Sequence, residues 1–113
     1  MTNPLPPQIA SYFLAKDSGD AASLDLCLAP DVIVRDPGEN TEVRGRAEVK
    51  AWILQTHKKF TLSTKITDSR LDADVITVDT LVSGDFPGSP LPFAYRFSLE
   101  KGKITSIDIA QTE

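Results

Sequence analysis

Residues 31–52 read DVIVRDPGENTEVRGRAEVKAW, and this stretch decides how the chain is expected to fold. A β-branched strand ends at Asp36, Pro37-Gly38 turns the chain, and a short return strand leads into a helix. Side chains of a strand alternate between its two faces, so Val32, Val34 and Asp36 share one face. A carboxylate therefore ends an otherwise apolar row. Such an inward carboxylate is either costly or useful, which makes it the first candidate for a functional residue.

The composition is that of an ordinary globular protein. The 113 residues are expected to form a single domain over 1–113. The net charge of −4 argues against nucleic acid or an anionic membrane surface as the main partner. No apolar run approaches the roughly 18 residues of a membrane span, and the N-terminus lacks a signal-peptide pattern. The single cysteine, Cys27, allows no internal disulfide and fits a cytoplasmic location.

Residue periodicity predicts helices first and strands second. Helices are expected over 8–16, 21–28 and 46–58, and strands over 32–36, 42–44, 61–70, 73–83, 91–100 and 103–109. Because the last four strands are consecutive and joined by short connections, they predict an antiparallel meander. The expected fold class is α+β, a cone-shaped curled antiparallel (mixed) sheet wrapped around three N-terminal helices. Such a cone leaves an internal cavity at its open end.

The order and spacing of four segments resemble the nuclear transport factor two-like superfamily, specifically its SnoaL-like and ketosteroid-isomerase-like branch. These segments are YFLAKDSGD, LAPDVIVRDPG, VRGRAEVKAW and YRFSLEKGKITSIDI, and the resemblance extends from about Gln8 to Ala110. It implies the cone fold, often a homodimer, and activities such as those of ketosteroid isomerase, polyketide cyclases, dehydratases and epoxide hydrolases. Many members are non-catalytic, so the fold alone assigns no chemistry.

The match to ketosteroid isomerase is partial. The resemblance places Asp36 where that enzyme has its general base, and Tyr12 where a tyrosine donates to the substrate oxyanion. Phe93 stands at the position of the second oxyanion donor, and Ile53 at that of a supporting tyrosine. Loss of one such donor costs about 2.7–4 kcal/mol of transition-state stabilisation. A true steroid isomerase is therefore not expected.

Asp36 and Tyr12 each have a second interpretation. Asp36 is expected to abstract a proton next to a carbonyl or to orient a water, and burial beside Val34 and Trp52 would make it a better base. The alternative is that Asp36 only caps the Pro37-Gly38 turn through its side chain. Tyr12, in turn, is either a ligand contact or a core residue whose hydroxyl is satisfied at the rim.

Asp79 is a further candidate, because the resemblance puts the face with Thr77, Asp79 and Leu81 inside the cone. Asp36 and Asp79 would then share a proton or divide the acid and base roles. The alternative is a local ion pair between Asp79 and an arginine. The opposite face of this strand would lie outside, and its apolar residues predict a homodimer through a partner sheet: Ile76, Val78 and Val82.

The other inward apolar residues are expected to line the cavity or to fill the core. They are Val34, Trp52, Phe93, Tyr95, Phe97, Ile107 and Ile109. No residue pattern indicates a metal site or a cofactor. The sequence therefore predicts a protein that binds a small apolar or aromatic molecule, with Asp36 as base if it catalyses isomerisation, cyclisation or dehydration. The alternatives are a non-catalytic ligand-binding or interaction domain, and a dimerisation module with a collapsed cavity, on the same fold.

Overall fold

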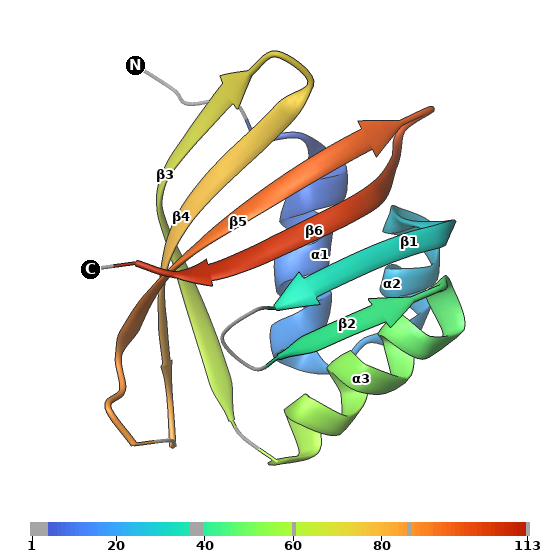
Figure 1. The fold of residues 1–113 in the computed structure, drawn as a ribbon. Coiled ribbons are helices and arrows are strands. Elements are labelled where there is room, and N and C mark those ends of the chain that lie inside the picture. Colours follow the sequence, from blue (N-terminus) through green and yellow to red (C-terminus); the bar gives the residue numbers. More distant parts are fainter. Residues whose placement is uncertain (1–4, 37–39, 60, 86, 113) are drawn as a thin grey trace.

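The structure, a computed structural model, describes residues 5–36, 40–59, 61–85 and 87–112. Within these residues, three helices and one six-stranded sheet confirm the predicted α+β class (Figure 1). The elements are α1 (Pro7–Ser18), α2 (Ala21–Cys27), β1 (Leu28–Asp36), β2 (Thr41–Arg44), α3 (Arg46–Lys59), β3 (Leu62–Asp72), β4 (Val75–Gly84), β5 (Leu91–Glu100) and β6 (Lys103–Gln111). None of the helices in the described ranges is both long and apolar enough to cross a bilayer.

The ends of α1 and α2 follow from local sequence. A proline occupies the first turn of α1, where its missing N–H is not needed. Gly19 ends this helix in the left-handed conformation, with φ of 73°, and its N–H donates to the Ala15 carbonyl oxygen at 2.8 Å. Asp20 then caps α2, because its carboxylate accepts the Ser23 N–H at 3.2 Å.

The sheet is mixed and open, with the strand order β2-β1-β6-β5-β4-β3. Strands β3 to β6 form the predicted antiparallel meander. Strand β1 joins the meander by a parallel pairing with β6, in which Val34 lies opposite Ile107 and Arg35 opposite Asp108. Strand β1 also begins four residues earlier than predicted, at Leu28, which pairs with Ile104 after a shift in register. The hairpin of β1 and β2 lies beside α3, and all three helices lie on the concave side of the sheet (Figure 1).

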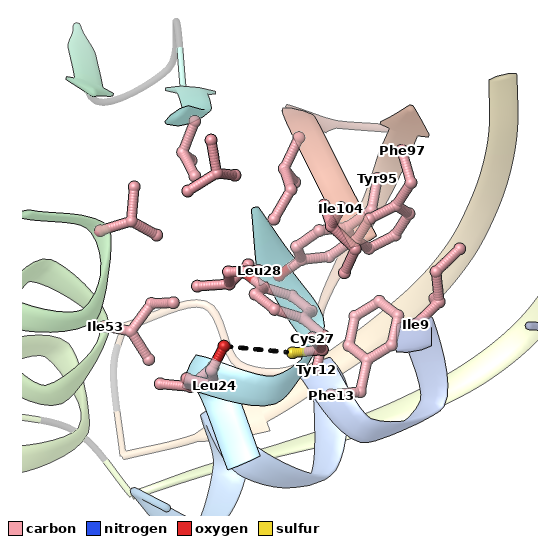
Figure 2. Packing of buried hydrophobic residues seen from close by; sticks show 14 of the residues in the cluster. Ile9, Tyr12, Phe13, Leu24, Cys27, Leu28, Ile53, Tyr95, Phe97 and Ile104 are labelled. Carbon is pink, nitrogen blue, oxygen red and sulfur yellow. Dashed lines mark hydrogen bonds between the residues drawn. The ribbon is translucent and has the colours of Figure 1, made fainter. Parts of the chain in front are cut away.

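The core lies between α1 and the concave face of the sheet. Its fully buried side chains come from all parts of the chain: Ile9, Tyr12, Leu24, Leu28, Val32, Val34, Val49, Val78, Phe97, Ile104 and Ile107. Cys27 is also buried and donates its thiol hydrogen to the Leu24 carbonyl oxygen at 3.7 Å (Figure 2). Burial raises the pKa of this thiol to about 11, so Cys27 is an unreactive core residue at neutral pH.

The predicted orientation of β4 is wrong. Its buried face carries Ile76, Val78 and Val82, which are 6%, 0% and 5% exposed. Ile76 pairs with Phe97 and Val78 with Tyr95 in β5, so these residues point into the core together. A shift of one residue moves every side chain of a strand to the other face. The apolar face that would predict a partner sheet is therefore the core face, and Asp79 points away from it.

Candidate functional site

Asp36 stands at the end of the inner row of β1. Val32 and Val34 are fully buried in this row, and Asp36 is half-buried. The pairing of β1 with β6 extends to Arg35 opposite Asp108, so Asp36 lies one residue beyond it, and the next residue of β6, Ile109, pairs with Tyr95 of β5. Neighbouring strands lie about 4.8 Å apart, so the backbones of Asp36 and Tyr95 are separated by roughly 10 Å across the curved sheet. The Pro37-Gly38 turn, which Asp36 would cap in the alternative interpretation, lies outside the described residues.

Tyr12 approaches this row from α1. Its side chain is fully buried, and its hydroxyl has no hydrogen-bond partner among the described residues. Tyr12 is therefore a core residue, but the prediction that its hydroxyl is hydrogen-bonded at the rim is wrong. Burial raises the pKa of Tyr12 well above its usual value, and the charges of Tyr95, Cys27, Asp17 and Asp36 add to this effect. The hydroxyl consequently stays protonated and is available as a donor.

Four aromatic rings connect α1 to β5: Tyr12, Phe13, Tyr95 and Phe97 (Figure 2). The Tyr12 ring meets Phe97 edge-to-face with centroids 5.6 Å apart, and Phe13 meets Tyr95 in the same way at 5.0 Å. Tyr95 is only 6% exposed. Its pKa is raised by burial first and then by the charges of Asp17 and Asp36. Both tyrosines therefore lie within electrostatic reach of the Asp36 carboxylate.

A partly buried ion pair at the C-terminal end of α1 was not predicted from the sequence. The Lys16 ammonium donates to Asp17 Oδ1 at 3.0 Å and to Thr64 Oγ1 of β3 at 2.9 Å. Asp17 Oδ2 accepts the Thr64 N–H at 2.8 Å, so three groups lock α1 onto the edge strand. The Lys16 side chain is 10% exposed, and burial lowers its pKa although Asp17 acts in the opposite direction. Nothing in the local sequence indicated Thr64 as a partner, because it lies on a strand far along the chain from α1.

The remaining candidates are the predicted lining residues, which are either fully packed in the core or partly exposed at its edge. Val34, Phe97 and Ile107 are fully buried, and Ile109 is nearly so, which makes them packing residues in this structure. Trp52 and Phe93, in contrast, are partly buried and pack against the outside of the core cluster. These two aromatic side chains are predicted lining residues that keep part of their surface exposed.

Asp79 does not join this group. Its carboxylate accepts from Arg70 Nη1 at 2.6 Å on the outer face of the sheet, and the same guanidinium nitrogen lies 3.0 Å from Asp68. The ion-pair alternative for Asp79 is thus confirmed, and a carboxylate pair with Asp36 inside the cone is wrong. The pKa of Arg70 is raised by hydrogen bonds to Asp79 and Asp68, as befits a charge cluster at the surface.

Comparison with known proteins agrees with this arrangement. The profile of the SnoaL-like domain matches residues 9–107. The chain belongs to the SnoaL-like family. No curated protein matches this SnoaL-like chain, but solved structures do.

A proposed polyketide cyclase from Sinorhizobium meliloti is 31% identical to this SnoaL-like chain, with a TM-score of 0.87 over 94% of this chain and 95% of the other. A protein of ketosteroid isomerase-like fold from Catenulispora acidiphila, solved with trimethylamine, is 20% identical with a TM-score of 0.82, covering 96% and 86%. An epoxide hydrolase from M. tuberculosis is 15% identical with a TM-score of 0.76, covering 93% and 80%. The last two show the shared fold alone, and together the three confirm the nuclear transport factor two-like resemblance.

Proposed function

We propose that this SnoaL-like chain binds a small, largely apolar carbonyl compound beside Asp36 and that Asp36 is its general base. The observation that carries the proposal is the buried Tyr12 hydroxyl, which has no hydrogen-bond partner among the described residues, in a core that also holds the inner row of β1 ending at Asp36. A buried hydroxyl without a partner costs about 1–3 kcal/mol, and a carbonyl oxygen of a ligand would satisfy it. Trp52 and Phe93 supply the partly exposed apolar surface that such a ligand needs.

The proposed reaction needs only side chains of this chain as its base, acid and hydrogen-bond donor. The Asp36 carboxylate takes the proton from the carbon next to the carbonyl, and the electron pair moves onto the carbonyl oxygen as an enolate. The Tyr12 hydroxyl donates a hydrogen bond to that oxygen. Asp36 then returns the proton to another carbon, or the enolate carbon attacks a second carbonyl. For isomerisation the enolate is conjugated with a carbon–carbon double bond, and the proton returns to the far carbon of that bond. In cyclisation the oxygen of the attacked carbonyl takes the proton from Asp36, and in dehydration a hydroxyl on the β-carbon leaves as water with that proton. The proposed cyclase activity of the Sinorhizobium meliloti relative supports this class of reaction.

Enolisation of a generic ketone tests the proposal without knowledge of the natural substrate. In D₂O the α-protons of 2-tetralone exchange for deuterium, and proton NMR measures the rate. Wild-type protein is expected to accelerate the exchange, and Asp36→Asn to lose about 10²–10⁴-fold of that acceleration. Asp79→Asn is the matched control, since this carboxylate lies on the outer face, and its rate should equal that of wild type. Full acceleration by a folded Asp36→Asn variant would refute the assignment of the base.

The ring packing favours a second candidate, a non-catalytic domain with a filled cone. The rings of Phe13, Tyr95 and Phe97 contact Tyr12 or one another at 5.0–6.5 Å, and Tyr12 has no exposed surface. Such a domain would show no rise in melting temperature with 2-tetralone or with a panel of aromatic ketones, whereas a ligand-binding protein is stabilised by mass action. The homodimer remains a prediction from the family resemblance, and sedimentation velocity at micromolar concentration tests it.

A further inference from the structure

Lys16 is a largely buried amine that the proposed reaction at Asp36 does not use. It follows Tyr12 by one helical turn, so both side chains leave α1 on the side that faces the core. The side chain of Lys16 is 10% exposed. Within the described residues its ammonium has two hydrogen-bond acceptors, Asp17 Oδ1 at 3.0 Å and Thr64 Oγ1 at 2.9 Å. Since an ammonium carries three protons, one N–H remains without an acceptor among these residues.

Thr64 fixes the orientation of the Asp17 carboxylate. Oδ1 of Asp17 accepts the Thr64 hydroxyl at 3.0 Å, and Oδ2 accepts the Thr64 N–H at 2.8 Å. Because this hydroxyl gives its proton to Asp17, a lone pair of Thr64 Oγ1 is left to accept from the Lys16 ammonium. Lys16 Nζ is thus held 3.0 Å from Asp17 Oδ1, a distance that allows proton transfer between them. An amine beside a positioned proton acceptor is the arrangement of a nucleophile with its base.

Lys50 offers a comparison within the same chain, because it also pairs with an aspartate. Its ammonium lies 2.8 Å from Asp25 Oδ1, but the two side chains are 25% and 47% exposed. The side chains of Lys16 and Asp17 are 10% and 22% exposed. Burial lowers the pKa of Lys16, although Asp17 acts in the opposite direction. At a given pH, more of Lys16 is therefore the neutral, nucleophilic amine than of a fully hydrated lysine.

We propose that Lys16 forms a Schiff base with an aldehyde or an unhindered ketone and that Asp17 transfers the protons of this reaction. This second activity goes beyond the proposed function, because it assigns no step to Asp36 or Tyr12. The ligand class is restricted to aldehydes and ketones, since their carbonyl oxygen leaves as water when an amine condenses with them. An ester or a thioester would acylate the amine instead.

The atoms and charges of this reaction balance without an oxidant or a reductant. Asp17 takes a proton from the Lys16 ammonium, and the nitrogen lone pair forms a bond to the carbonyl carbon. The carbonyl electron pair moves onto the oxygen, which receives a proton from the nitrogen, so that a neutral carbinolamine results. Asp17 then returns its proton to this hydroxyl, the nitrogen lone pair forms the C=N bond, and water leaves. The product is a positively charged iminium beside the Asp17 carboxylate, with the same total charge as the starting pair.

Pentane-2,4-dione tests the proposal, because the Schiff base of a 1,3-diketone rearranges to a stable enaminone. The intact mass is expected to rise by one diketone less one water, and peptide mapping should place this adduct on Lys16 before any other amine. Lys16→Arg keeps a cation for Asp17 and Thr64 but has no nucleophilic amine, so it should lose the adduct. Lys50→Met is the matched control, which removes the more exposed lysine–aspartate pair and should keep the adduct on Lys16.

Asp17→Asn distinguishes a proton carrier from a charge that only stabilises the ammonium. If Asp17 acted through its charge alone, its removal would leave more neutral Lys16 and a faster reaction. We expect a slower reaction in the folded variant, because an amide cannot take up the ammonium proton and return it to the carbinolamine. An equal or faster rate would overturn the role of Asp17.

The adduct is measured by mass and the Asp36 chemistry by deuterium exchange, so the two proposals fail separately. Folded wild-type protein without an adduct on Lys16 would overturn the Schiff-base role, and so would equal rates at Lys16 and Lys50. The Lys16–Asp17 pair would then serve only to join α1 to β3. Thermal melts establish that each variant is folded, and Lys16→Arg is expected to melt close to wild type because its guanidinium preserves the ion pair.

Discussion

Replacement of Tyr12 by phenylalanine should make the protein more stable. The side chain is fully buried in the aromatic cluster, and its hydroxyl has no partner among the described residues. Phenylalanine keeps the ring contacts with Phe13 and Phe97 and removes only the unsatisfied group. An unsatisfied buried hydroxyl costs about 1–3 kcal/mol, so Tyr12→Phe should raise the free energy of unfolding by up to that amount.

The expected shift in melting temperature follows from the size of the chain. Unfolding entropy is about 2.1 cal/mol/K per residue, or about 0.24 kcal/mol/K for 113 residues, so each kcal/mol corresponds to roughly 4 °C. Tyr12→Phe should therefore melt about 4–12 °C higher than wild type by circular dichroism or calorimetry. Thr80→Val is the control with opposite sign, because it removes a hydroxyl that is hydrogen-bonded to Phe93. A lower melting temperature for Tyr12→Phe would refute the view that this hydroxyl is unsatisfied in the protein without a ligand.

Two further predictions concern the C-terminal end of α1. Burial lowers the pKa of Lys16, so the unfolded chain binds this proton more tightly, and stability should rise with pH toward the usual value near 10.4. Lys16→Met should remove this rise in the urea midpoint, measured across roughly pH 7 to 9.5; an unchanged pH profile would contradict the burial of the ammonium. Gly19→Ala should lose at least about 1–2 kcal/mol, because Gly19 has positive φ and its new Cβ would lie 2.7 Å from His57 Cδ2. Partial recovery in the double variant with His57→Ala, measured by thermal melts, would confirm the steric part.

Much of the fold was predictable because its elements are locally encoded. The helical spacing over 46–58 and the run of four consecutive strands each carry a short-range signal, and both predictions were confirmed. The parallel pairing of β1 with β6 was not predictable in this way. It joins residues such as Val34 and Ile107, which are far apart in the chain, and no local pattern specifies such a partner.

The error in β4 has a particular origin. The strand alternates between Ile76, Val78 and Val82 on one side and Asp79 on the other, and hydrophobicity alone orients it correctly. The orientation of a residue can be carried over from a distant family only if the two strands are aligned without a shift of even one residue. A register shift between Ile66 and Asp68 of β3, opposite Asp79, shows that this part of the sheet is irregular.

For the candidate site, sequence alternation was enough to find Asp36, but the partners of Asp36 could not be found in the same way. Tyr95 looks like one of several core aromatics in β5, and only the strand order β1-β6-β5 places it two strands away from β1. The Lys16–Asp17 pair likewise depends on Thr64 of an edge strand 47 residues away from Asp17. These polar contacts depend on pairing between segments far apart in the chain, and the local periodicity of the sequence does not predict such pairing.

Because β6 is synthesised long after β1, the parallel pairing of these two strands forms late during synthesis. Asp36 is made 67 residues before Lys103, where its neighbouring strand begins. At about 5–20 residues per second, the ribosome needs roughly 3 to 13 s to cover that distance. Through that interval the edge of β1 that later pairs with β6 is unpaired, and an unpaired strand edge recruits other chains. Yield in the cell should consequently respond more strongly to translation speed and to chaperones than the equilibrium stability of the finished protein would indicate.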